Sequence, residues 1–183
     1  MAYLAAAVAL VSALGVLNLL LTVTVIRRLR QAPSVLGGHS AEQRLLRVGA
    51  TVTGFSSTTV DGLRITGTSF HAPTLVTFFS TDCGACTDEI PHVVAWLERH
   101  RYPRAQALAV VTGDPDQAGP FLDALRERVA LVVEPVHGAL STAFATTAFP
   151  ACYLVDATGT VLAAASAIDD LVAEPVAVGD SPA

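Results

Sequence analysis

Hydrophobic residues are spaced in two different ways along this chain. From Leu4 to Ile26 they run almost without a break for 23 residues that carry no charge. A helix needs about 20 apolar residues to cross a bilayer, so this stretch predicts an N-terminal transmembrane helix. The alternatives are a cleaved signal peptide, which normally begins with basic residues that are missing here, and a buried core helix, which the arginines that follow disfavour.

From Val48 onward, short runs of apolar and β-branched residues alternate with segments of helical spacing. Asp61-Gly62 and Thr158-Gly159 are turn signals that join the first and last pairs of runs into hairpins. The predicted strands are Thr51–Phe55, Leu63–Thr66, Thr74–Ser80, Ala107–Thr112, Val129–Val133, Cys152–Asp156 and Val161–Ser166.

Three segments between these strands have helical character. The first, residues 84–100, has one apolar face formed by Ile90, Val93, Val94 and Leu97. The second, residues 115–128, opens with Asp114 as N-cap and Pro115 at the first helical position. The third is shorter and covers residues 138–146. Strands separated by helices and closed by a hairpin predict an α/β fold with a mixed sheet flanked by helices.

The domain organisation follows from these segments. Residues 1–30 are interpreted as a membrane anchor with a basic flank, 31–47 as a tether, 48–172 as one domain and 173–183 as a C-terminal tail. The tail leaves room for little more than a helical turn or two after Asp169. A long final helix is therefore missing or truncated.

Composition and charge narrow the class of function. Hydrophobic residues make up 52% of the 183 residues and the net charge is −5, which disfavours nucleic-acid binding. Lysine and arginine near a membrane span favour the cytoplasmic side, and here they lie C-terminal to the span. A dithiol held at a membrane is more useful outside the cytoplasm, where disulfides persist. On the second argument, we expect a single-pass cell-membrane protein with an extracytoplasmic domain.

The segment with the clearest chemistry is Cys83-Gly84-Ala85-Cys86, between a predicted strand and a predicted helix. A cysteine at a helix N-terminus meets unpaired backbone N–H groups and the helix dipole, which favour a thiolate. The second sulfur lies one turn further, close enough to form a disulfide. Half of a zinc site is the main alternative, but the chain has no second Cys or His pair at matching spacing.

Together these segments resemble a known family. The strand before Cys83, the two cysteines, Pro91 in the next helix and Phe149-Pro150 before a late strand resemble the thioredoxin fold over about residues 48–168. More narrowly, they resemble the bacterial membrane-anchored thioredoxin-like thiol-disulfide oxidoreductases of methylamine utilisation and cytochrome maturation. The resemblance implies that Cys83 attacks, that Cys86 resolves the mixed disulfide, and that Phe149 and a cis Pro150 position the substrate.

Three residues depart from the thioredoxin pattern and are candidates for tuning the dithiol. Asp82 stands before Cys83 in place of the usual aromatic residue, and a carboxylate there opposes thiolate formation or bonds to the backbone at the helix start. Thr77 stands where thioredoxins carry a buried acid that relays protons. Glu134 follows a strand and either transfers protons or sits in a solvated turn.

The other sulfur and imidazole groups have simpler interpretations. Cys152 is expected to be a buried, inert thiol rather than a third redox or metal-binding sulfur. The histidines at 71, 92, 100 and 137 are expected on the surface, and only His71 and His137 are worth testing as partners of the cysteines in a copper site. No metal or other cofactor is predicted.

The predicted function is therefore a membrane-tethered thiol-disulfide oxidoreductase. Its expected partners are protein or peptide thiols and disulfides, with a membrane redox protein as a further possibility. A copper-binding chaperone of the same fold is one alternative. A thiol peroxidase is another, because Ser80 precedes Cys83 by three residues.

Overall fold

The computed structural model describes residues 45–172 and six isolated residues nearer the N-terminus, at positions 3, 12, 14, 15, 18 and 19. Contacts divide the chain into two units, Met1–Gly38 and His39–Ala183. The six isolated residues are helical and exposed. Most of the predicted transmembrane segment and tether, and all of the tail, lie outside the described residues. Among the residues that are described, no helix has the length and apolar character needed to cross a membrane.

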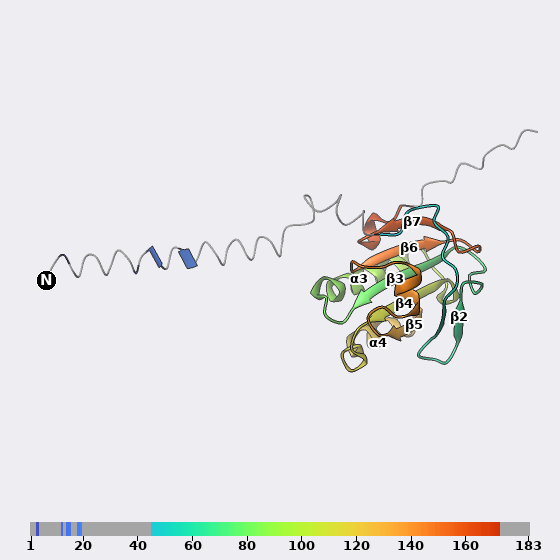
Figure 1. The fold of residues 1–183 in the computed structure, drawn as a ribbon, viewed down its shortest axis with the longest axis horizontal. Helices are drawn as coiled ribbons and strands as arrows, with labels where there is room; N and C mark the ends of the chain where they lie inside the picture. Colours follow the sequence, from blue (N-terminus) through green and yellow to red (C-terminus); the bar gives the residue numbers. More distant parts are fainter. Residues whose placement is uncertain (1–2, 4–11, 13, 16–17, 20–44, 173–183) are drawn as a thin grey trace, which may run out of the picture. The chain divides into compact units, whose positions relative to one another are not determined.

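A five-stranded mixed sheet forms the centre of the second unit (Figure 1). Its order is β5–β4–β3–β6–β7, with β3, β4 and β5 parallel to one another and β6 antiparallel to both β3 and β7. This is the mixed α/β sheet that the sequence predicts. The strands are β3 (Thr74–Ser80), β4 (Ala107–Thr112), β5 (Ala130–Glu134), β6 (Ala151–Val155) and β7 (Val161–Ala165).

Side chains of the central strand alternate between two hydrophobic cores, because successive residues of a strand point to opposite faces. Leu75 and Phe79 of β3 belong to the core on one face of the sheet, whereas Val76 and Phe78 belong to the core on the other. All four are buried. The central strand is therefore covered on both faces, in agreement with apolar residues at adjacent positions that point to opposite faces.

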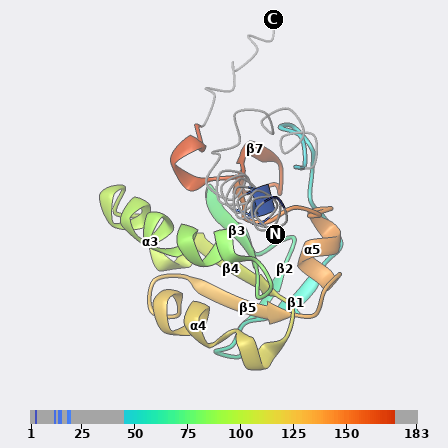
Figure 2. The same ribbon diagram turned by 90° about the vertical axis from the view of Figure 1, so that its left-hand side faces the viewer.

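Helices and a small hairpin cover the two faces of the sheet (Figure 2). α3 (Gly84–Arg99) and α4 (Gly119–Leu125) lie on one face, together with the 3-10 turn η3 (Ile168–Asp170). The other face carries α5 (Ala139–Ala143) and the antiparallel hairpin of β1 (Ser56–Thr58) and β2 (Arg64–Thr66). Two further 3-10 turns are η1 (Arg104–Gln106) and η2 (Pro115–Gln117).

The first predicted strand and the second predicted helix differ most from the structure. The first strand begins at Ser56 instead of Thr51, because Gly54 turns the chain with a φ of 77° and Thr51 forms only an isolated bridge to Thr160. The predicted helix over residues 115–128 is divided into η2 and α4. Pro120 has no N–H to donate, so it is accommodated only near the start of a new helix.

Candidate active site

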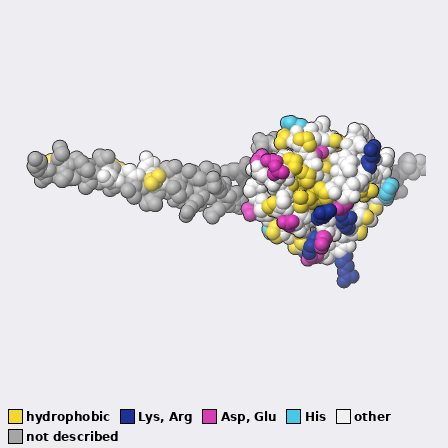
Figure 3. All heavy atoms as spheres, turned by 90° about the horizontal axis from the view of Figure 1, so that it is seen from below, with side chains coloured by type: hydrophobic (Ala, Val, Ile, Leu, Met, Phe, Trp, Pro, Cys, Tyr) yellow, Lys and Arg dark blue, Asp and Glu magenta, His cyan; other side chains and the backbone are white. Residues whose placement is uncertain are grey.

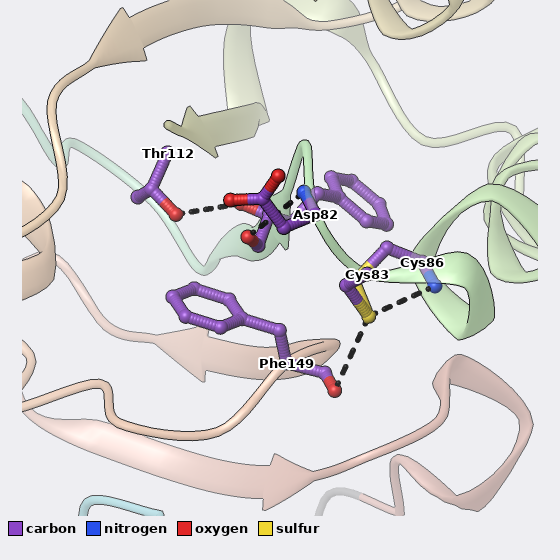
Figure 4. Close-up of a disulfide and its surroundings, with 7 residues drawn as sticks. Asp82, Cys83, Cys86, Thr112 and Phe149 are labelled. Carbon is purple, nitrogen blue, oxygen red and sulfur yellow. Dashed lines mark hydrogen bonds between the residues drawn. A yellow bond between two sulfur atoms is a disulfide. The ribbon is translucent and has the colours of Figure 1, made fainter. Parts of the chain in front are cut away.

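The two cysteines lie where the central strand leads into the first long helix. β3 ends at Ser80, Cys83 is the N-cap of α3, and Cys86 lies within the first turn. The two sulfurs form a disulfide across a Cα–Cα distance of 5.3 Å (Figure 4). Cys83 is half-buried and Cys86 is fully buried. Only the first sulfur is therefore accessible to a second molecule.

Two backbone groups meet the sulfur of Cys83. The backbone N–H of Cys86 donates to it at 3.2 Å, and the carbonyl oxygen of Phe149 lies 3.6 Å away (Figure 4). In the reduced state the N–H group stabilises a thiolate, whereas the carbonyl accepts a hydrogen bond from the neutral thiol. The site therefore contains one group that favours the thiolate of Cys83 and another that favours its neutral thiol.

Phe149 and Pro150 bring a distant part of the chain against the dithiol. Their peptide bond is cis, which confirms the predicted isomer, and β6 begins at the next residue. The Phe149 side chain packs against both hydrophobic cores. Both residues are only partly buried, so this loop forms one wall of an accessible surface beside Cys83.

The loop before Cys83 is fixed from the neighbouring strand and leaves Asp82 exposed. The N–H of Thr81 donates to the carbonyl of Thr112 at 3.0 Å, and the Thr81 hydroxyl accepts from the N–H of Asp114 at 3.2 Å. Asp82 makes its described hydrogen bond through its backbone N–H, to Ser80 Oγ at 3.4 Å. Its carboxylate points away from the two sulfurs (Figure 4).

Thr77 and Glu134 are occupied by structural hydrogen bonds. Thr77 is buried in β3 and its hydroxyl donates weakly, at 3.5 Å, to the carbonyl of Leu108. Glu134 is also buried, and its two carboxylate oxygens accept from the N–H groups of Leu140 and Ser141 at 3.0 and 2.7 Å. From the sequence, Glu134 is expected either to transfer protons or to have a solvated or turn role. The structure instead makes it the buried cap of α5.

Sequence reasoning missed Glu89, which lies three residues after Cys86 on α3. Its side chain is half-buried, and its Oε1 accepts from the N–H of Ile168 at 2.6 Å. Burial raises the pKa of this carboxyl, and the hydrogen bond from Ile168 only partly opposes that shift. The i, i+3 spacing from Cys86 is the signal that could have found it, because such residues share one face of a helix.

Cys152 lies in β6, directly opposite Thr77 of β3, and is completely buried. Burial is the main cause that raises the pKa of this thiol, and the charge of Glu89 adds to the effect. At neutral pH the thiol is therefore protonated and unreactive. This agrees with the predicted inert role.

The histidines in the described part of the chain do not form a cluster with the two sulfurs. His71 precedes β3 whereas Cys83 follows it, and seven extended residues span roughly 20 Å. His92 pairs with Asp169 at 3.4 Å, and His137 lies in a left-handed turn before α5. Within the part of the chain that is described, no group of three or more His, Cys, Asp or Glu side chains could hold a metal ion. The described residues therefore provide no set of copper ligands around the cysteines, and this geometry does not support the copper-binding alternative.

A sequence model of the AhpC/TSA family matches residues 48–164. No curated protein matches the chain by sequence.

Similar solved structures share the fold at low sequence identity. The thioredoxin domain of a thiol-disulfide oxidoreductase from Bacteroides vulgatus is 18% identical, with a TM-score of 0.57 over 68% of this chain and 92% of that one. A protein from Chlorobium tepidum assigned as the thiol:disulfide interchange protein DsbE is 18% identical, with a TM-score of 0.54 over 65% and 84%. A thio-disulfide isomerase from Thermus thermophilus is 17% identical, with a TM-score of 0.54 over 66% and 87%. The fold is therefore thioredoxin-like.

Proposed function

This chain belongs to the AhpC/TSA family, and on that premise we propose that it is a thiol-disulfide oxidoreductase that acts on protein cysteines through Cys83 and Cys86. The observation that carries the proposal is the arrangement of the two sulfurs. One is accessible at a helix N-terminus and the other is buried one turn behind it. That asymmetry suits an attacking and a resolving thiol.

The reaction takes place in two exchange steps. The thiolate of Cys83 attacks one sulfur of a substrate disulfide, and the electron pair of the broken S–S bond leaves with the other substrate sulfur, which takes up a proton. The thiolate of Cys86 then attacks Cys83 Sγ and releases the second substrate sulfur. The substrate is reduced to two thiols while the Cys83–Cys86 disulfide forms. In the opposite sense, the same steps oxidise a dithiol substrate.

The surroundings of Cys83 support the first step. The N–H of Cys86 and the N-terminus of α3 stabilise the attacking thiolate. The loop of Phe149 and Pro150 lies against the same sulfur, so an extended substrate segment beside this loop brings its disulfide to Sγ. We assign substrate positioning to these two residues.

The second step needs a proton acceptor, because Cys86 is buried and must lose its proton before it attacks. Glu89 lies one helical turn further along α3 and is half-buried, and its pKa is raised by that burial. A carboxyl whose pKa is raised toward the working pH exchanges protons more effectively than an ordinary one. We assign to Glu89 the transfer of this proton between Cys86 and solvent.

The proposal includes attachment of the domain to a membrane through Leu4–Ile26, with the domain outside the cytoplasm. It is supported by the length of the uncharged stretch and by the persistence of disulfides outside the cytoplasm. After mild reduction of intact cells, a membrane-impermeant maleimide should label Cys83. Labelling that requires permeabilised cells would place the domain on the cytoplasmic side instead.

Activity of cysteine variants tests the function itself. Insulin reduction with dithiothreitol as electron donor should be lost in Cys83→Ser. Cys86→Ser should accumulate a mixed disulfide between Cys83 and its substrate, which non-reducing electrophoresis detects. Cys152→Ser is the matched control and should retain activity. Wild-type exchange activity in Cys83→Ser would overturn the proposal, and hydroperoxide turnover that survives in Cys86→Ser would indicate a peroxidase.

A further inference from the structure

A cavity of about 620 Å³ lies at the end of the sheet opposite to the dithiol. It is bordered by β2 and by the first residues of the three parallel strands, Thr74, Ala107 and Ala130. Cys83 follows the other end of β3, roughly 20 Å away along the strand. The cavity is therefore separate from the redox site and takes no part in the exchange reaction described above.

The floor of this cavity is apolar and belongs to one of the two hydrophobic cores. Ile65, Phe70 and Leu108 line it and are buried at 7%, 4% and 3% relative exposure. Leu63 at its border is 62% exposed, which is unusual for a large aliphatic side chain. Exposed hydrophobic side chains lie beside arginine and acidic groups when this unit is seen from below (Figure 3). Contact with this floor would remove the apolar part of a ligand from water, which favours binding.

The charged side chains of the lining, Arg64 and Arg104, are both cationic. The other polar side chains are Ser69, His71 and Thr74, and none of the described residues that line the cavity is acidic. No described residue forms a hydrogen bond or ion pair with the Arg64 guanidinium, which leaves it available to a ligand. A planar guanidinium pairs best with a carboxylate or a phosphate.

Arg104 is held in place from outside the cavity. Its Nη2 donates to Asp61 at 2.6 Å, and its Nε and Nη2 donate to the carbonyl of Arg126 at 3.3 and 3.2 Å. Asp61 also accepts from Arg126, and these two arginines lower the pKa of its carboxyl. Asp61 therefore offsets part of the charge of Arg104 and leaves Arg64 as the main unpaired cation. One unpaired guanidinium favours a monoanion over a phosphate.

We infer that this cavity is a binding site for a small amphipathic carboxylate, with its carboxylate on Arg64 and its apolar body against Ile65, Phe70 and Leu108. The volume lies within the range of small-molecule sites, about 300–1,000 Å³. The floor selects an apolar body and the guanidinium selects a negative head. A cation of the same length meets no acidic side chain among the described residues of this lining and is repelled by its two arginines.

Calorimetric titration of the purified full-length protein with octanoate tests the inference. Octanoate should bind saturably, whereas octylammonium of equal chain length should not. Arg64→Ala should weaken octanoate binding by about tenfold, the usual value of one charge-assisted hydrogen bond. Ala105→Trp places a large ring at an exposed position of the lining and should abolish binding without removing a charge.

Two controls separate site binding from other effects. Arg47→Ala removes an exposed arginine that does not line the cavity and should leave octanoate affinity unchanged. Cys83→Ser should also bind octanoate normally, so the result does not depend on the redox function. Partitioning into lipid or detergent is common to all variants and cancels in the comparison. Equal affinity in Arg64→Ala and wild type, equal binding of octylammonium, or no saturable octanoate binding would each overturn the inference.

Discussion

Replacement of Gly138 by alanine tests the assignment of Glu134 as the buried cap of α5. The backbone at Gly138 has a φ of −64°, which any residue adopts, so a methyl group adds no conformational strain. Its Cβ would, however, clash with Cδ of Glu134 and lie 2.5 Å from Oε2 and 2.7 Å from Cβ of the same residue. Rotation of the carboxylate cannot relieve the contact with Cβ. The side chain and the adjoining backbone must therefore move apart.

The cost of this movement follows from the hydrogen bonds that it breaks. Glu134 accepts from the N–H groups of Leu140 and Ser141, and the carboxylate is buried. A hydrogen bond to a charged group contributes about 1.5–3 kcal/mol, and partial relaxation recovers some of the loss. We expect Gly138→Ala to lower the free energy of unfolding by about 3 kcal/mol, and the melting temperature by roughly 10 °C.

Urea unfolding followed by the fluorescence of Trp96, the single tryptophan, measures this change. Gly119→Ala is the matched control, since an added Cβ there meets no heavy atom within 4 Å, and its unfolding free energy should change by less than about 1 kcal/mol. In a Glu134→Ala background, two of the three close contacts are gone, so Gly138→Ala should cost less than it does alone. A Gly138→Ala protein as stable as wild type would refute the cap geometry.

Two more predictions concern side chains whose pKa is raised by burial, Glu89 and Cys152. Because burial raises the pKa of Glu89 above its ordinary value of 4.5, its ionisation disfavours the folded state as the pH rises through that region. Glu89→Gln, whose Oε1 can still accept from Ile168, should therefore gain stability relative to wild type between pH 4 and 7 in urea unfolding, and should slow the Cys86-dependent exchange step. The native reduced protein should react with iodoacetamide at Cys83 but not at Cys152 at pH 7, by mass spectrometry of tryptic peptides; equal labelling of both thiols would contradict the burial of Cys152.

The sequence predicts the central strands well because both of their faces are buried. β3 and β4 have the predicted bounds, since these strands carry no charged residue and are rich in apolar, β-branched and aromatic residues. The dithiol at a helix start also follows from the sequence, because it depends on the local order of a strand, two cysteines and a helix. The cis bond before Pro150 is instead implied by the resemblance to the thioredoxin fold, since a proline before a β-run is usually trans.

Features that depend on contacts between distant segments were harder to predict. The hairpin begins five residues later than expected, because the strand propensity of Thr51–Phe55 is overridden by the turn at Gly54. Helical periodicity continues across Gly119 and Pro120, where the real helix restarts. Burial of an acid also depends on its three-dimensional surroundings. For that reason, the sequence leaves the role of Glu134 open between proton transfer and a solvated or turn position, and it does not single out Glu89.

The direction of the three parallel strands connects the two proposed sites. Loops at the carboxyl ends of β3 and β4 form the redox site, where Thr81 is bonded to Thr112 and Asp114 and Cys83 begins α3. The opposite ends of β3, β4 and β5 border the cationic cavity. Because the buried strands between them are shared, a ligand in the cavity can alter dithiol chemistry only by changing the packing of this sheet. A ligand that fits the existing cavity requires no change in this packing. Octanoate is therefore expected to stabilise the fold without changing the rate of thiol-disulfide exchange.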